Sequence, residues 1–178
     1  MEFLGKRLCL YDQVTKSGIE SDSCVRLIRD EGRRGRAVAE NSFVPRLTMK
    51  GYRTTPSFVE ICRMSQGQLE NVRNFTIENE HGRVQFLDTT NLVGLNLDKI
   101  VSVGHKMVEF YPNESEKPRV GQGLNKQALI TYYGFGKPVG VEEGKFEKKI
   151  RKWTKSIQAN FVEYNAQEKF IKIHVKHF

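Results

Sequence analysis

The sequence predicts an α+β fold: a mostly antiparallel sheet or half-open β-barrel flanked by two helices. Three observations support this class. Most of the chain beyond residue 44 consists of short β-branched or aromatic runs bounded by Gly, Pro, Asn or Asp. Two segments stand out because their apolar residues recur at helical spacing. No internal repeat of about 20–50 residues is visible, which argues against a solenoid or propeller.

The strands are predicted from runs of residue types that favour extended backbone. The last strand is the clearest, because Ile171, Ile173 and Val175 alternate with polar or basic residues. This period of two places an apolar face inward and a basic face outward. The predicted strands cover residues 75–77, 84–87, 100–103, 107–111, 129–133, 161–164 and 169–178.

Two helices are predicted from capping signals and apolar periodicity. The first begins at Thr55-Pro56-Ser57, where Thr55 can cap the helix and Pro56 suits the first helical position. It ends before Gly67. The second covers about residues 144–158, with apolar residues at steps of four, three and four and lysines on its other face. Its apolar stripe consists of Phe146, Ile150, Trp153 and Ile157.

Charge and periodicity divide the chain into two parts. Residues 1–44 carry eight basic and seven acidic residues without sustained periodicity, which predicts a loosely ordered N-terminal segment. Residues 45–178 carry 21 basic and 14 acidic residues and are predicted to form the folded domain. Almost all of the formal net charge of +8 therefore lies in this domain.

Composition and motif spacing argue against several functional classes. The sequence contains no run of about 18 apolar residues, so no membrane-spanning helix is predicted. Lys6 and Arg7 interrupt the N-terminal apolar residues too early for a signal peptide. Both observations indicate an intracellular protein. No CxxC pair or cluster of His and carboxylates predicts a metal site. Residues 121–125 lack the third glycine and the Lys-Ser or Lys-Thr of a phosphate loop, so no cofactor is predicted, and we interpret them as a turn that aims Asn125.

The C-terminal part of the chain is strongly basic. Residues 145–178 hold nine basic and three acidic residues, interleaved with aromatic residues. Two kinds of partner fit such a surface: an acidic protein, or RNA or DNA. Trp153 lies on the apolar helical stripe and is predicted to be in the core. The candidate partner surface comprises Lys148, Lys149, Arg151, Lys152, Lys155, Lys172 and Lys176.

A series of motifs in one order resembles the nucleoporin autoproteolytic domain of the GLFG-repeat nucleoporins. The resemblance covers about residues 45–178 and is nearly free of gaps. Collinear motifs of this kind are far more specific than any one of them. The motifs are Leu47-Thr48 to Gly51-Tyr52, Thr55-Pro56-Ser57, Phe75-Thr76-Ile77, residues 94–101, Val108 to Tyr111, Lys117-Pro118, residues 120–125, Phe161 to Tyr164 and the final His177-Phe178.

The resemblance implies a self-cleavage site at the end of the chain. Domains of this family cut their own chain after a His-Phe pair, using the hydroxyl of the following serine in an N-to-O acyl shift and then ester hydrolysis. By resemblance, Phe178 supplies the carbonyl and His177 assists proton transfer or holds the bond. Asn125 is the candidate for a positioning or oxyanion contact.

The same resemblance implies that the chain on its own cannot complete the reaction. The sequence stops at Phe178, so the nucleophilic serine is absent, and we expect a product form or a nucleophile-less form. Such serine-type autoproteolysis occurs in a single turnover, and no turnover on other substrates is expected. Family members usually carry Phe-Gly repeats, whereas the one Phe-Gly pair here is Phe135-Gly136, inside the domain.

The family implies a protein-docking role in the nuclear pore complex of the nucleus. Its processed domain fastens a nucleoporin to the scaffold, through the β-propeller of an outer-ring nucleoporin or through the segment that it released. Weak RNA binding by the lysine-rich surface is a further expectation. The alternative function left open by the residues is a basic RNA- or DNA-binding module that uses this C-terminal surface.

Overall fold

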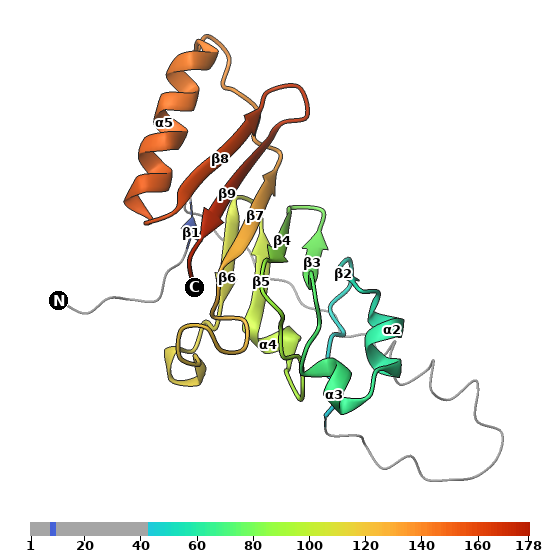
Figure 1. Ribbon diagram of the computed structural model, residues 1–178. Coiled ribbons are helices and arrows are strands. Elements are labelled where there is room, and N and C mark those ends of the chain that lie inside the picture. The colour runs from blue at the N-terminus through green and yellow to red at the C-terminus, as the bar shows by residue number, and fades with distance from the viewer. Residues whose placement is uncertain (1–7, 10–42) are drawn as a thin grey trace.

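The computed structural model describes residues 8–9 and 43–178, and of residues 8–9 the backbone alone. Its largest element is a six-stranded sheet in which all neighbouring strands are antiparallel (Figure 1). In spatial order the strands are β2 (Arg53–Thr55), β3 (Thr76–Asn79), β4 (Gly82–Phe86), β7 (Ala128–Tyr133), β9 (Phe170–Val175) and β8 (Asn160–Asn165). The predicted antiparallel sheet is confirmed, and it is open at β2 and β8 rather than closed into a barrel.

One face of the large sheet is covered by two elements side by side. The ring centroid of Phe110 in the small sheet lies 5.7 Å from that of Phe86 in β4. Farther along the sheet, the ring centroid of Trp153, in a helix, lies 5.9 Å from that of Tyr132 in β7. Phe86 pairs with Ala128, four residues before Tyr132, so both contacts are on the same face. The covering elements are the sheet of β1 (Leu8–Cys9), β6 (Met107–Phe110) and β5 (Val101–Gly104), and the helix α5 (Glu143–Ser156).

In the last strand, β9, apolar and polar side chains alternate as predicted, and the apolar side chains lie on the covered face of the large sheet. Ile171, Ile173 and Val175 are buried in β9, while the residues between them are partly exposed. Full burial of such a side chain stabilises the fold by about 1.5–3 kcal/mol. Because β9 lies between β7 and β8, its apolar face joins the core under α5 to the core under the small sheet.

The first predicted helix begins two residues later than expected. Helix α2 (Phe58–Arg63) is capped by Ser57, not by Thr55, which is the last residue of β2 and pairs with Thr76. The Ser57 hydroxyl accepts a hydrogen bond from the Glu60 backbone N–H at 3.3 Å, and the Glu60 carboxylate accepts from the Ser57 N–H at 2.8 Å. This reciprocal capping box outcompetes a lone threonine cap.

Several short elements were not predicted. Helix α3 (Gln66–Leu69) contains Gly67, where the first helix was expected to have ended already, and has a capping box of its own at Ser65. Strand β2, helix α4 (Leu97–Ile100) and the 3-10 helix η1 (Glu114–Glu116) were also missed. Each is too short for a hydrophobic period to show. The long helix was predicted correctly, because α5 has 14 residues, about four turns, along which the apolar stripe repeats.

Two predicted boundaries concern the ends of the domain. The last strand ends at Val175 rather than at Phe178. Of the three residues after it, Phe178 is buried in the core, Lys176 is exposed and His177 is partly exposed. The N-terminal segment of residues 1–44 lies outside the described residues except for 8–9 and 43–44. The division into residues 1–44 and 45–178 therefore stays a prediction.

Candidate functional site

The side chain of Phe178 occupies an aromatic pocket between the two sheets. Phe178 is 3% exposed, and its ring centroid lies 4.2 Å from that of Phe110 and 6.1 Å from that of Phe86. Phe86 in turn stacks on Phe75 at 5.9 Å. The four rings come from four separate parts of the chain, so the pocket exists only once both sheets have formed. Burial of a ring this size orients the Phe178 backbone as well as stabilising the core.

The backbone of Phe178 is held by Asn125, which is itself buried. Asn125 is 3% exposed, and its Oδ1 accepts a hydrogen bond from the Phe178 N–H at 3.0 Å. Its Nδ2 donates to the carbonyl of Pro118 at 2.8 Å. The structure thus brings together two of the three predicted site residues. Asn125 contacts the amide nitrogen of Phe178 and not its carbonyl, which is the geometry of a positioning contact.

A closed turn presents Asn125 to Phe178. The Gly121 N–H donates to the Asn125 carbonyl at 2.7 Å, which closes residues 121–125 on themselves. Gly123 has a φ of +52°, and a Cβ added there would lie 2.7 Å from the Tyr111 hydroxyl. Glycine is therefore required at residue 123 for both conformation and space.

Tyr111 is a site residue that the sequence did not single out. It is 5% exposed, and its Oη accepts a hydrogen bond from the Leu124 N–H at 3.0 Å. Burial raises the pKa of the Tyr111 hydroxyl, while the hydrogen bond from Leu124 opposes that shift. In the sequence its signals are its place at the end of a predicted strand and in the Val108 to Tyr111 motif of the resemblance, and neither points to its partner 13 residues away.

His177 lines a cleft and contacts the backbone oxygen of Phe178. Its Nδ1 is 3.4 Å from that oxygen, which belongs to a carboxylate in the 178-residue chain and stands for the carbonyl oxygen of a Phe178 peptide bond. The cleft has a volume of about 340 Å³. Because β9 ends at Val175, the side-chain alternation of a strand does not extend to His177. The cleft is lined by Lys155, Gln158, Ala159, Asn160, Lys176 and His177.

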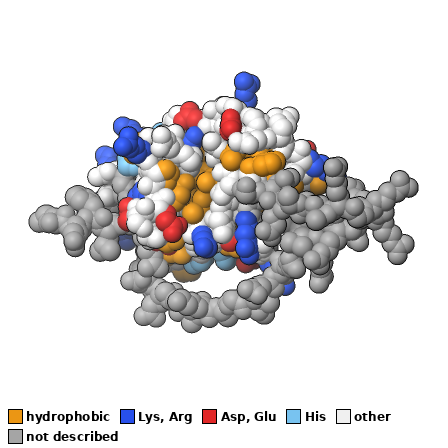
Figure 2. All heavy atoms as spheres, turned by 90° about the horizontal axis from the view of Figure 1, so that it is seen from below, with side chains coloured by type: hydrophobic (Ala, Val, Ile, Leu, Met, Phe, Trp, Pro, Cys, Tyr) orange, Lys and Arg blue, Asp and Glu red, His pale blue; other side chains and the backbone are white. Residues whose placement is uncertain are grey.

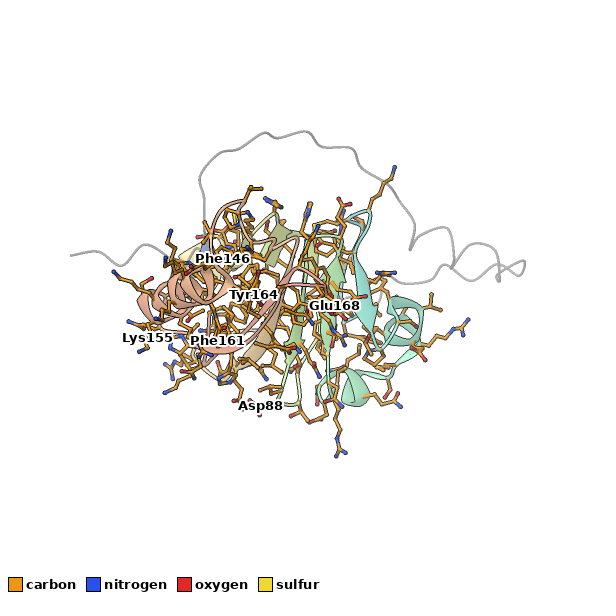
Figure 3. The ribbon with its side chains drawn as sticks, turned by 90° about the horizontal axis from the view of Figure 1, so that it is seen from above. Asp88, Phe146, Lys155, Phe161, Tyr164 and Glu168 are labelled. Atoms are coloured by element: carbon orange, nitrogen blue, oxygen red, sulfur yellow. The ribbon has the colours of Figure 1, made fainter. Side chains whose placement is uncertain are left out.

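The predicted basic surface divides into paired and unpaired charges. Arg151 contacts Glu147 at 2.6 Å and lies 3.9 Å from the centroid of the Phe161 ring, and Lys172 pairs with Glu163 at 3.2 Å. In Figure 3, Phe146, Phe161 and Tyr164 lie along α5 and β8, and Lys155 points away from them. Within residues 43–178 no ion pair engages the five other members: Lys148, Lys149, Lys152, Lys155 and Lys176.

Metal ligands, a membrane-spanning helix and a second cleft are the other features that bear on function. Among residues 8–9 and 43–178, no three His, Cys, Asp or Glu side chains are placed to hold one metal ion. Within those ranges no helix is long and apolar enough to cross a membrane. A second, smaller cleft of about 190 Å³ adjoins Lys126, whose ammonium group donates to the Thr89 carbonyl at 2.7 Å. That bond gives Lys126 a structural partner.

Sequence comparison identifies one family. Its profile, described as Nucleoporin2, Nup98-96 autopeptidase, matches residues 49–178. The chain is 33% identical over 148 residues to the nuclear pore complex protein Nup98-Nup96 of Dictyostelium discoideum, which covers 78% of this chain. It is 31% identical over 141 residues to Nup98-Nup96 of Drosophila melanogaster, covering 72% of this chain. In both cases the match spans only 7% of the relative's own length.

Structural comparison gives the same fold. A crystal structure of the Chaetomium thermophilum Nup145N APD, solved as a mutant fused to Nup145C N, superimposes with a TM-score of 0.65 at 28% identity. The match covers 71% of this chain and 94% of that one. The yeast heterotrimeric Nup82-Nup159-Nup116 nucleoporin complex also matches, with a TM-score of 0.65 at 23% identity over 73% of this chain and 98% of that one. At that identity the second match bears on the fold alone.

Proposed function

This chain belongs to the Nup98-96 autopeptidase family, and on that premise we propose that it is a docking domain of the nuclear pore complex whose own polypeptide is cleaved after Phe178. The observation that carries the proposal is the anchoring of Phe178. Its ring is buried, its N–H is bonded to Asn125, and its carbonyl oxygen lies beside His177. A residue held at three points has its carbonyl fixed for attack by the residue that follows it.

The anchored geometry supports a specific division of labour in the cleavage. A serine following Phe178 attacks the Phe178 carbonyl carbon with its hydroxyl oxygen, and the C–N bond breaks as the C–O ester bond forms. The hydroxyl proton ends on the freed amine, and water then hydrolyses the ester to a carboxylate. His177, at 3.4 Å from the carbonyl oxygen, is placed to move a proton or to hold that oxygen. Asn125 fixes the Phe178 nitrogen.

Asn125 is better suited to positioning than to stabilising an oxyanion. One of the two N–H groups of Nδ2, the donor that an oxyanion would need, points to the Pro118 carbonyl at 2.8 Å, and among residues 43–178 no hydrogen bond joins Nδ2 to Phe178. Its remaining polar atom, Oδ1, is an acceptor and accepts from the Phe178 N–H. Of the two roles expected for Asn125, positioning is therefore the one that we propose.

Cleavage is tested by extending the chain with Ser and several further residues. We expect the purified extended chain to shorten to residues 1–178 without added protease, as measured by intact mass. Replacing the added Ser with Ala should leave the chain whole. His177→Ala should slow the reaction at least a hundredfold if the imidazole takes part chemically. A wild-type extended chain that stays intact for days would refute cleavage, though not docking.

Docking is the second half of the proposal and has separate support. The relatives named above are nuclear pore complex proteins, and the unpaired lysines of α5 fit an acidic protein surface. We place the protein in the nuclear pore of the nucleus, held by a scaffold nucleoporin. The contact would be the β-propeller of an outer-ring nucleoporin or the C-terminal segment released by cleavage.

A binding experiment separates the two docking partners. The purified chain is titrated against an outer-ring β-propeller nucleoporin of the same organism and against a synthetic peptide of the segment that follows Phe178. Micromolar or tighter binding to either one supports the proposal. Binding to neither, together with binding to single-stranded RNA that falls steeply with salt, would favour the basic nucleic-acid module instead.

A further inference from the structure

The end of strand β6 holds Phe178 in two ways through adjacent residues. The ring of Phe110 is the nearest aromatic neighbour of the Phe178 ring, at 4.2 Å between centroids. The next residue, Tyr111, bonds through its hydroxyl to the Leu124 N–H at 3.0 Å. Leu124 directly precedes Asn125, whose side chain accepts from the Phe178 N–H at 3.0 Å. Side chain and amide are thus fixed from one short segment.

The backbone at Tyr111 is bent in a way that makes this double contact possible. Tyr111 has a φ of +53°, a conformation that is uncommon for a residue other than glycine. In a regular strand the side chains of residues 110 and 111 would point to opposite faces. Here both are buried, at 4% and 5% exposure. A strained residue that brings a polar group to a site calls for a functional reading.

Among residues 43–178, no other side chain from outside residues 117–125 bonds to the backbone of the turn. The turn of residues 121–125 closes on itself through the Gly121–Asn125 bond, and its Asn125 side chain bonds to Pro118. The Tyr111 hydroxyl, from the residue directly after β6, accepts from the Leu124 N–H of the turn. Gly123 leaves room for it, since a Cβ there would come within 2.7 Å of the hydroxyl oxygen.

We infer that Tyr111 is a positioning residue for the self-cleavage reaction, acting through Leu124 and Asn125 on the peptide group of Phe178. The inference rests on the cleavage part of the proposed function. Tyr111 touches none of the reacting atoms. Its hydroxyl fixes the turn, the turn fixes Asn125, and Asn125 fixes the nitrogen side of Phe178.

The chain provides a matched control in Tyr52. The Tyr52 hydroxyl accepts a hydrogen bond from the Val103 N–H at 2.8 Å, much as Tyr111 does from Leu124. Burial raises the pKa of both hydroxyls. Within residues 43–178, no hydrogen bond or ring contact joins Tyr52 to the turn of residues 121–125 or to Phe178. The Tyr52 hydroxyl also donates to the Val103 carbonyl at 3.4 Å, so Tyr52→Phe removes at least as much hydrogen bonding as Tyr111→Phe, but at a place that does not lead to the site.

The first test compares cleavage rates in the chain extended by Ser. Tyr111→Phe should slow cleavage about tenfold, the effect of losing one net hydrogen bond in the reacting geometry. Tyr52→Phe should leave the rate within twofold. In an Asn125→Ala background, Tyr111→Phe should add less than twofold, because the two residues act through one contact. Equal slowing by the two tyrosine variants, or full additivity with Asn125→Ala, would overturn the inference.

The second test does not require cleavage. Native-state hydrogen exchange of the Phe178 amide is measured by NMR in the 178-residue chain. Tyr111→Phe should speed exchange at Phe178 about tenfold, and Tyr52→Phe should leave it unchanged. If the extended chain proves inert, the proposed cleavage fails on its own, and exchange still decides whether Tyr111 positions Phe178. An unchanged Phe178 exchange rate in Tyr111→Phe would contradict the positioning role.

Discussion

The Phe178 site and the exposed face of α5 are both rich in functional candidates, but their side chains are held in opposite ways. At the site, Phe178, Asn125 and Tyr111 are at most 5% exposed and joined by rings and hydrogen bonds. On the helix, Lys148, Lys149, Lys152 and Lys155 are exposed and have no ion pair within residues 43–178. Cleavage of a peptide bond needs the reacting groups to be held in a fixed geometry. Recognition of a charged partner needs only the electrostatic potential of clustered charges, which mobile side chains can supply.

The apolar and basic surfaces also differ in how they are distributed. Seen from below, the molecule shows apolar side chains bordered by Lys and Arg (Figure 2). The large exposed apolar residues are Val59, Leu87, Val120, Val139 and Val162, which come from five different parts of the chain. Single exposed apolar residues need no special explanation. The basic face of α5 is the more continuous feature, since its lysines follow one helix.

Among the proposed substitutions, Phe178→Ala should reduce stability most. A small effect would contradict the contrast between the buried site and the exposed face of α5. Removing the ring leaves a cavity beside Phe86 and Phe110, so the free energy of unfolding should fall by about 3–5 kcal/mol. Urea denaturation measures it. The control is Phe161→Ala, whose half-buried ring lies under Arg151 and should lose clearly less. Similar losses for both variants would show that Phe178 is not anchored.

Asn125→Ala should have the next largest effect. It leaves the Phe178 N–H and the Pro118 carbonyl without their partner, which should reduce the free energy of unfolding by about 1–3 kcal/mol. Asn91→Ala is the control, because the exposed Asn91 side chain also accepts from a backbone N–H, that of Val93 at 2.9 Å, and caps no described helix. That variant should change stability by less than about 0.5 kcal/mol. A neutral Asn125→Ala would remove Asn125 from the site.

A smaller effect should appear at alkaline pH. Burial holds the pKa of Tyr111 above its ordinary value of about 10, so the unfolded chain loses this proton first as pH rises. The contribution to stability is complete below about pH 10 and is lost as pH rises toward the folded-state pKa. The stability gap between wild type and Tyr111→Phe should therefore narrow between pH 8 and pH 11, as measured by urea denaturation. A constant gap would mean that the hydroxyl does not titrate with unfolding.

Charge reversal on α5 should change stability least and binding most. Lys148→Glu combined with Lys152→Glu should alter the free energy of unfolding by less than about 0.5 kcal/mol per substitution, because both side chains are exposed and unpaired. Affinity for an acidic nucleoporin partner should fall at least fivefold at low salt. Lys50→Glu with Arg73→Glu makes the same charge change elsewhere and should leave affinity unaltered. Equal losses from the two pairs would mean that only net charge matters.

The sequence predicted the long periodic elements well and the short ones poorly. The alternation in β9 and the apolar stripe of α5 were both correct, because each repeats over several residues. Helix α2 was predicted from Thr55 and Pro56, although the stronger signal was Ser57 followed three residues later by Glu60. Helix α4 and strand β2 offer no period at all, and their formation depends on neighbours distant in the chain.

The sequence proposes the members of the candidate site, and the structure shows how they are held. Asn125, His177 and Phe178 were all named, and the structure joins Asn125 to Phe178 across 53 residues of sequence. It also joins Phe178 to Phe110, and Tyr111 to Leu124. No local pattern encodes these pairings, because the partners lie on different sheets and turns. Tyr111 was missed for that reason.

The sequence by itself determined the family, the antiparallel fold class and the basic character of the C-terminal part. Collinear motifs, hydrophobic periodicity and charge can all be read from the order of residues, without knowing which distant residues meet. Only the tertiary structure decided that β9 ends at Val175 and that Phe178 turns into the core. The physical reason is that the partners of Phe178 are distant in the sequence: its ring is buried beside Phe86 and Phe110, and its N–H bonds to Asn125.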